Sequence, residues 1–483
     1  MTAVSDAVGA ASRPFTAIEE LDHYLENARE PGVVQLETHA AGHLDPGALE
    51  TALADVLAAD PAARRRLAAP SRWGRRLHWQ AGSVPAAAAG LITTATWDSP
   101  AQLDALRERL SAWPIPLRDT AVRVILAAGP EHDVVIVQVH HSAFDGISHL
   151  ALLTALGAAY RDRAAAAPRP APPPPPRAEA PAHPPAPAHP AAAPHSLPAS
   201  HSTPAAHPPP APHPAQGDPA RKLARPGGRR PVRAFRPAAV TRIAPRGGQP
   251  DRPGYGFVLR SVAVPRPARR GAGPHPTVND LLVAALIAAI DGWNQAHGRR
   301  SGQIRITVPV NDRDPQRRWA GPGNQSRLIR VTAGPRDRAD PARLLGHVAA
   351  QTRAGKEQRR AGLDGASRLL AAGWAPTVVK GGTARLVRRL AGPVGTDTSL
   401  VRNLGVPSEP PWFSGRGQEP VWLSGPAPMP RGLAVGAITV AGRLHLSVHY
   451  RHALLDRAAA EDFTDAYCRV LADLAGPAPA RPS

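Results

Sequence analysis

Cysteine and aromatic residues are scarce in this 483-residue chain. The single cysteine, Cys468, excludes an intramolecular disulfide framework and any zinc site built from several cysteines, and it favours a reducing compartment. Phe, Trp and Tyr make up only 4% of the residues, but Ala, Leu and Val carry most of the 43% hydrophobic content and still permit packed helices and sheets. We therefore expect a globular protein, long enough for two domains.

Lysine is almost absent, since Lys222, Lys356 and Lys380 leave 55 of the 58 basic residues to arginine. A formal charge of +20 is typical of proteins that bind nucleic acid, membrane phosphates or acidic partners. However, abundant Arg, Ala, Gly and Pro with little Lys is also what a GC-rich genome produces, and no basic patch alternates with aromatic residues. We favour this compositional explanation and expect no nucleic-acid partner, while a functional basic surface stays open.

Long apolar runs are also missing. The longest extends from Leu281 to Ile290 between Asp280 and Asp291, far short of the roughly 20 residues that span a bilayer. Residues 1–15 have no basic start followed by an apolar core, as a signal peptide would. The sequence therefore predicts a cytoplasmic protein without a transmembrane segment.

The middle of the chain is rich in Pro, Ala and His and has almost no large apolar residue. Such a composition cannot bury enough surface to offset the entropy of ordering. We expect a disordered linker at 164–229 between an N-terminal lobe, 1–163, and a C-terminal lobe, 230–483. Histidines recur in it every six residues, about 19 Å apart in polyproline II, too far for neighbours to share an ion; they are His183, His189, His195, His201, His207 and His213.

Both lobes mix helix and strand signals, so we expect an α/β (α+β) protein. In the N-terminal lobe, Asp45-Pro46 predicts a helix start. Apolar runs at 121–127 and 134–139 predict a hairpin, and apolar residues from Ile147 to Leu156 predict a helix directly after it. The C-terminal lobe is expected to contain helices at 279–293 and 341–360, a strand at 304–310, a hairpin at 433–450 turning at Ala441-Gly442, and a closing helix that Gly476-Pro477 ends.

Chemistry concentrates at residues 140–146, His-His-Ser-Ala-Phe-Asp-Gly, where the hairpin leads into the helix. Consecutive residues at a strand end point to opposite faces, so His140 and His141 are expected to face different surroundings. Asp145 can hydrogen-bond locally or hold a cation, and Gly146 lets the backbone reverse without a Cβ clash. An imidazole mounted beside such a turn is well placed to act as a general base.

The pattern His-His-x-x-x-Asp-Gly at a strand-to-helix junction resembles the signature of the CoA-dependent acyltransferase superfamily. This superfamily includes nonribosomal peptide condensation domains, polyketide-associated acyltransferases and the wax ester synthase/diacylglycerol acyltransferase family. Further segments resemble family segments in the same order: 44–65, Pro116-Leu117-Arg118, 277–280, 308–313, Gly323-Asn324, and Arg402-Asn403-Leu404-Gly405, where Arg replaces the family's Ser.

The resemblance implies two chloramphenicol acetyltransferase-like lobes that form a V around a central tunnel. It implies that His141 is the general base, that His140 is its structural neighbour, and that Asp145 forms an ion pair with Arg313 that fixes the turn. Asp145 could instead be only a helix N-cap. The resemblance further suggests Asn279, Asn324 and Asn403 as possible substrate-channel residues, although each could equally belong to a turn or cap.

The reaction implied is direct transfer of an acyl group from a thioester, on CoA or on the phosphopantetheine arm of an acyl or peptidyl carrier protein, to an alcohol or amine. No cofactor and no metal are expected, because the sequence has no zinc-ligand pattern and no G-x-x-x-x-G-K-[ST] loop. We favour a free-standing condensation-type enzyme of secondary metabolism, as in nonribosomal peptide synthesis. A wax ester synthase/diacylglycerol acyltransferase-like enzyme and a non-catalytic relative that binds carrier proteins are the alternatives.

Overall fold

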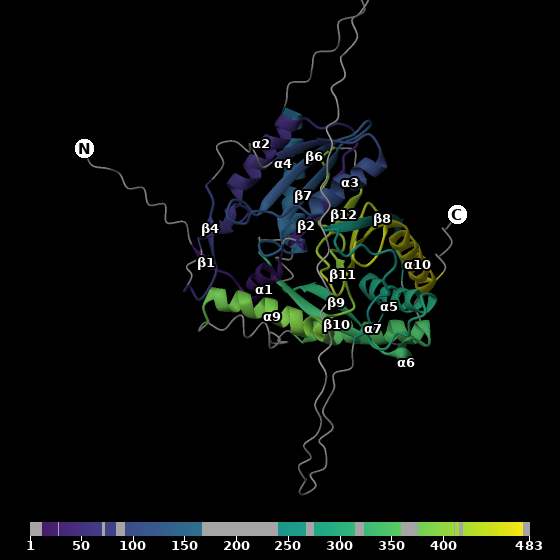
Figure 1. Cartoon of the computed structure of the whole chain (residues 1–483). Helices are drawn as coiled ribbons and strands as arrows, with labels where there is room; N and C mark the ends of the chain where they lie inside the picture. Colours follow the sequence, from purple (N-terminus) through teal and green to yellow (C-terminus); the bar gives the residue numbers. More distant parts are fainter. Residues whose placement is uncertain are drawn as a thin grey trace, which may run out of the picture. The chain divides into compact units, whose positions relative to one another are not determined.

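Two β-sheets, each covered by helices, form the body of the protein (Figure 1). The computed structural model describes residues 12–27, 29–69, 73–83, 92–166, 240–266, 275–313, 323–358, 375–409, 411–414 and 419–476. The predicted linker at 164–229 lies outside the described residues from position 167 onward, so it stays a prediction.

The N-terminal lobe is built on a five-stranded sheet with the order β12-β2-β7-β6-β5. Its strands are β2 (Val33–His39), β5 (Ile92–Thr96), β6 (Val122–Ala128), β7 (Val134–His140) and β12 (Val421–Ser424). β6 and β7 form the predicted hairpin, with Val122 opposite Val139. β7 is buried along its whole length, which agrees with its almost continuous apolar sequence.

Helices cover both faces of this sheet. On one face α2 (Pro46–Ala59) and α4 (Gly146–Ala166) pack with Val135 and Val137. On the other face α3 (Pro100–Ser111) packs with Val134 and Ile136, as the alternation of side chains along β7 requires. Asp45 caps α2 by accepting a hydrogen bond from the Gly47 amide, as predicted.

The C-terminal lobe is built on a six-stranded sheet with the order β10-β9-β11-β13-β14-β8. The strands are β8 (Tyr255–Ala263), β9 (Ile304–Asn311), β10 (Ser326–Ala333), β11 (Ser399–Asn403), β13 (Leu433–Val440) and β14 (Arg443–Arg451). The predicted turn between β13 and β14 is present, with positive φ angles of 49° at Ala441 and 72° at Gly442, as a two-residue type I′ hairpin turn requires.

The helix α5 (Val278–Ala296) is buried on nearly all sides between residues 280 and 290, as expected of a helix that is apolar all round. α10 (Arg457–Ala475) and α7 (Pro341–Glu357) pack against it. The closing helix ends at Gly476, whose φ of 76° favours glycine. A short helix, α6 (Pro335–Arg338), precedes α7.

A third, small sheet has the order β1-β4-β3, from β1 (Arg13–Pro14), β3 (Arg65–Leu67) and β4 (His78–Ala81). Near it α1 (Ala17–Leu25) packs against α9 (Thr377–Gly395). Thr16 and Glu19 close a reciprocal capping box at the start of α1. Among the described residues, no helix is long and apolar enough to cross a bilayer.

Candidate active site

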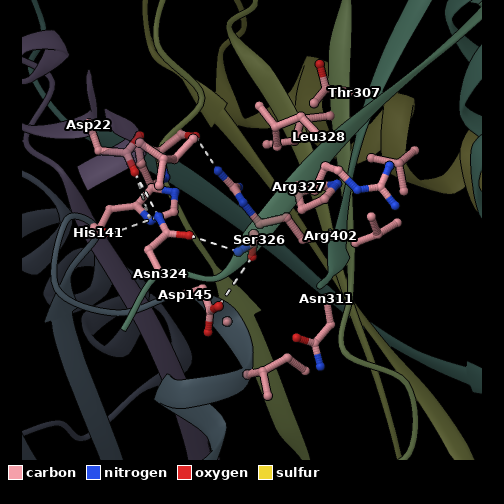
Figure 2. Close-up of a pocket in the computed structure, with 18 of the residues that line it drawn as sticks. Asp22, His141, Asp145, Thr307, Asn311, Asn324, Ser326, Arg327, Leu328 and Arg402 are labelled. Carbon is pink, nitrogen blue, oxygen red and sulfur yellow. Dashed lines mark hydrogen bonds and ion pairs between the residues drawn. The ribbon is translucent and has the colours of Figure 1, made fainter. Parts of the chain in front are cut away.

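A cavity of about 690 Å³ opens beside the junction of β7 and α4 (Figure 2). Residues from both lobes line it. The N-terminal lobe contributes His141, Asp145 and Gly146, and the C-terminal lobe contributes Arg313 and Arg402. Asn279, Asn324 and Asn403 also line this cavity, so the structure brings together every site residue that the sequence suggested except His140.

His140, at the end of β7, is not among the residues that line the cavity and is only 1% exposed. Its Nδ1 accepts a hydrogen bond from the Ser142 amide at 3.2 Å, so its Nε2 carries the hydrogen and donates to Glu26 at 2.8 Å. Burial raises the pKa of Glu26, but the hydrogen bonds from His140 and from the Gly32 amide help to outweigh burial and leave that pKa below its usual value. Both ring nitrogens of His140 are therefore hydrogen-bonded within the protein, as expected of a residue that supports the local structure.

His141 follows immediately and lines the cavity, with its side chain 26% exposed. Its amide donates to the Gly32 carbonyl at 2.7 Å, which holds the backbone of the strand end. Its Nδ1 lies 3.4 Å from the Phe144 carbonyl, so a hydrogen on Nδ1 can be donated there. In that tautomer Nε2 keeps its lone pair, and no described residue forms a hydrogen bond with Nε2.

Asp145 sits at the turn into α4 and is 1% exposed. Its Oδ2 lies 2.6 Å from Arg313 Nη1, so the ion pair implied by the family resemblance is present. Its Oδ1 accepts hydrogen bonds from the Ser148 amide at 2.8 Å and hydroxyl at 2.9 Å. Asp145 is therefore both an N-cap of α4 and an ion-pair partner, and it ties the turn to the C-terminal lobe.

Gly146 allows the close approach of β11. A Cβ at this position would stand 2.7 Å from Leu404 Cδ2, well inside normal contact. Leu404 follows β11 in the segment Arg402-Asn403-Leu404-Gly405. The absence of a side chain at Gly146 therefore lets this segment lie against the turn that follows His141.

Asp22, on α1, is a site residue that sequence reasoning missed. Its Oδ2 lies 3.9 Å from His141 Nδ1 and accepts a hydrogen bond from Asn324 Nδ2 at 3.0 Å. Figure 2 shows Asp22, His141 and Asn324 gathered on one side of the cavity. Burial raises the pKa of Asp22, and the charges of His141 and His140 partly offset this rise. No short motif marks α1, so only the fold could reveal this residue.

The three asparagines have different surroundings. Asn324 holds Asp22 as described, and its Nδ2 also lies 3.5 Å from the His141 carbonyl. Asn403 Oδ1 accepts a hydrogen bond from the Gly405 amide at 2.9 Å, which is a turn-forming contact. Asn279 lies in the first turn of α5 and lines the cavity.

Among the described residues, one group offers three possible metal ligands close together. Ligand atoms of His23, Glu26 and His140 lie within 4.8 Å of one another. Burial lowers the pKa of His23 to about 4, so its imidazole is neutral near pH 7. The Glu26 carboxylate accepts hydrogen bonds from His140 and from the Gly32 amide, the latter at 3.1 Å. Hydrogen bonds within the protein therefore explain the positions of Glu26 and His140 without a metal ion.

Comparison with known proteins identifies the fold. No family model matches the chain. The starter condensation domain of rhizomide synthetase, a double mutant in complex with C8-CoA and Leu-SNAC, is 13% identical, covers 99% of this chain and 98% of that chain, and superposes with a TM-score of 0.58. The first condensation domain of the calcium-dependent antibiotic synthetase is 15% identical over 96% of each chain, with a TM-score of 0.56.

The chain has a condensation-domain-like fold. The epimerization domain from the third module of tyrocidine synthetase B shares it, with 14% identity over 96% of each chain and a TM-score of 0.53. The expected two-lobe α/β fold is thus confirmed. Two uncharacterised proteins of Mycobacterium tuberculosis are 28% identical over 286 residues, which is 58% of this chain. The alignment spans 57% of the length of these relatives.

Proposed function

We propose that this condensation-domain-like chain is an acyltransferase of secondary metabolism that moves an acyl group from a thioester to a hydroxyl or amine, with His141 as general base. One observation carries the proposal. His141 lines the cavity, its Nδ1 is near the Phe144 carbonyl and its Nε2 lone pair is free, while Asp145 and Arg313 fix the turn beside it. A free imidazole on a rigid mounting is what proton abstraction requires.

The proposed reaction needs no acyl-enzyme. Nε2 of His141 removes the proton from the acceptor as its oxygen or nitrogen attacks the thioester carbonyl. The tetrahedral intermediate then collapses, the carbon–sulfur bond breaks, and the imidazolium returns the proton to the departing thiolate. The products are an ester or amide and a free thiol, and His141 is regenerated neutral.

The donor is proposed to be an acyl group on CoA or on the phosphopantetheine of a carrier protein. The solved relatives support this assignment, because a rhizomide synthetase domain with the same fold was crystallised with C8-CoA and Leu-SNAC. Proteins with this fold also belong to the synthetases of tyrocidine and of the calcium-dependent antibiotic, which supports a place in secondary metabolism. The thioester is itself the activated substrate, so the proposed chemistry uses no further cofactor.

The test is an assay of free thiol release by the full chain. A panel of acyl-CoA and acyl-carrier-protein donors is combined with alcohol and amine acceptors, and each product is identified by mass. We expect His141→Ala to lower the rate by about 10²–10⁴, the usual contribution of a general base. Amine acceptors yield amides and favour condensation, whereas long-chain alcohols favour the wax ester synthase-like alternative.

The matched control is His347→Ala on α7, a partly exposed histidine whose Nε2 lies 3.1 Å from the Thr332 carbonyl. This variant should keep the wild-type rate. Full activity of His141→Ala would show that His141 is not the general base. A well-folded wild-type chain that binds acyl-carrier protein yet releases no thiol with any pair would favour the non-catalytic relative.

A further inference from the structure

Two arginines on the cavity wall have no hydrogen bond to a carboxylate among the described residues. Arg402, on β11, has its Nη1 3.3 Å from His449 Nε2 and donates from Nη2 to the Pro426 carbonyl at 2.8 Å. His449 is fully buried, and burial holds its pKa well below the usual value, so it is neutral. Arg431 also lines the cavity, and its Nε is buried without a hydrogen-bond partner in the described part of the chain. Neither arginine forms an ion pair with a carboxylate among the described residues.

The carboxylates around them are already engaged. Asp397 lies 3.7 Å from Arg305 and 3.5 Å from Arg330, and it accepts a hydrogen bond from Thr307. Its charge also acts on Arg431, so at least three arginines share this one carboxylate. Asp22 faces His141 and Asn324 instead. This part of the cavity wall therefore has an excess of positive charge.

A purely structural role explains this arrangement poorly. Both arginines are half-buried, and a cation that is partly removed from water without a carboxylate partner is unfavourable. Burial and the charge of Arg431 lower the pKa of Arg402 to about 9, so it is still a cation near pH 7. A ligand that supplies the missing negative charge would explain why the chain keeps both groups here.

We propose that Arg402 and Arg431 form a subsite for an anionic oxygen group, a carboxylate or phosphate, of a substrate bound in this cavity. Guanidinium groups present paired N–H donors that match the oxygens of both groups. The subsite would orient the substrate rather than react with it. This inference rests on the proposed function, since it assigns the subsite to a substrate of the transfer reaction.

The position of Arg402 suits this role. It precedes Leu404, which lies against Gly146 beside His141, so the subsite and the proposed base belong to one cavity. The anion can come from two sources. It is either a phosphate of CoA on the donor side or a carboxylate on the acceptor.

Calorimetric titration of the full chain with single ligands separates these sources. The first pair of probes is octanoyl-CoA and S-octanoyl-N-acetylcysteamine, which differ by the phosphate-bearing part of CoA. The second pair is leucine and leucinamide, which differ by the carboxylate. We expect the charged member of one pair to bind at least about tenfold more tightly than its neutral partner, as charge-assisted hydrogen bonds allow. Arg402→Gln and Arg431→Gln should each remove this preference without weakening the neutral probe.

Arg402→Lys should retain part of the preference, because it keeps the charge but not the fork of donors. The control is Arg300→Gln, at an exposed arginine outside the cavity lining, which should bind like the wild type. The melting temperature of Arg402→Gln should equal or exceed that of the wild type, since the change removes a half-buried cation that has no carboxylate partner among the described residues. Equal affinity of the wild type for both members of both pairs would overturn the subsite, as would an unchanged preference in Arg402→Gln.

Each ligand is titrated alone, so no acyl transfer is needed for the result. If the chain binds the charged probe more tightly but releases no thiol, the subsite is supported and the proposed reaction is overturned. If the chain releases thiol but binds the charged and neutral probes equally, the reaction is supported and the subsite is overturned. The two failures are therefore distinguishable.

Discussion

At the scale of single residues, the contact of His141 with Asp22 makes a kinetic prediction. The Asp22 carboxylate, 3.9 Å from Nδ1, stabilises the imidazolium that forms when His141 takes a proton. We expect Asp22→Asn to lower kcat about tenfold with little change in KM, because the amide keeps the shape and the contact with Asn324. The measurement is steady-state thiol release.

The pH profile separates this positioning role from a structural one. Burial raises the pKa of Asp22, so its carboxylate is protonated at a higher pH than an ordinary aspartate. The rate of the wild type should therefore fall on the acid side as pH drops through that raised pKa. Asp22→Asn has no such group and should lose this part of the profile. An unchanged acid limb in the variant would show that Asp22 does not act through His141.

The ion pair between Asp145 and Arg313 makes a stability prediction. Its side chains are only 1% and 2% exposed, and removing one partner of a buried pair typically costs about 3–5 kcal/mol. We expect Arg313→Ala to lower the free energy of unfolding by this amount in urea denaturation. The control is Arg163→Ala, since the Arg163–Asp55 pair is 43% and 48% exposed and should contribute no more than about 1 kcal/mol. An equal loss of unfolding free energy in Arg313→Ala and Arg163→Ala would show that the Asp145–Arg313 pair does not stabilise the fold.

At the scale of secondary-structure elements, the apolar periodicity predicted the hairpins of both lobes and the helices that follow them. These elements are long and their patterns are local, so neighbouring residues determine them. β12 was not predicted, because four residues carry too little pattern to define a strand. It lies in the C-terminal half of the sequence yet pairs with β2, with Val421 opposite Thr38. Only long-range contacts reveal that a strand from the C-terminal half of the sequence completes the N-terminal sheet.

The close contact between β12 and β13 makes a prediction about Gly436. A Cβ at Gly436 would overlap the Leu423 carbonyl oxygen of β12, and backbone atoms cannot move aside as a flexible side chain can. We expect Gly436→Ala to lower the free energy of unfolding by at least about 2 kcal/mol. Gly292 lies in α5, and apart from its own helix backbone no described residue comes within 4 Å of an added Cβ, so Gly292→Ala should stabilise by up to about 1 kcal/mol. Chemical denaturation measures both changes, and a neutral Gly436→Ala would show that the strands do not lie so close together.

At the scale of the whole molecule, the two lobes do not correspond to two separate stretches of sequence. Residues of β13 pack into the core of the N-terminal lobe, as Ile438 and Val440 do, and β12 completes its sheet. The described parts of both lobes belong to one compact unit. The composition of the chain predicted a linker between two lobes, but it could not predict that the lobes share strands, because composition carries no pairing information.

Buried histidines in both lobes predict how this unit responds to acid. Burial lowers the pKa of His149 in the N-terminal lobe to about 3 and that of His452 in the C-terminal lobe to about 4. Both are neutral in the fold, whereas the unfolded chain binds their protons near pH 6.5. Their contribution to stability is therefore complete above pH 6.5, and it is lost as pH falls toward these lowered values.

The lowered pKa values give a measurable dependence of the free energy of unfolding on pH. Each such histidine lowers the free energy of unfolding by up to about 1.4 kcal/mol per pH unit below pH 6.5. His149 is fully buried and its Nε2 donates to the Val137 carbonyl at 3.0 Å, so a neutral glutamine can replace that donor without gaining a proton. We expect His149→Gln to lose roughly 2 kcal/mol less than the wild type between pH 7 and pH 5, measured by urea denaturation at each pH. Because the lobes share strands, the N-terminal and C-terminal halves should lose structure together in a single acid transition. Equal slopes for the two proteins would show that His149 is protonated in the folded state.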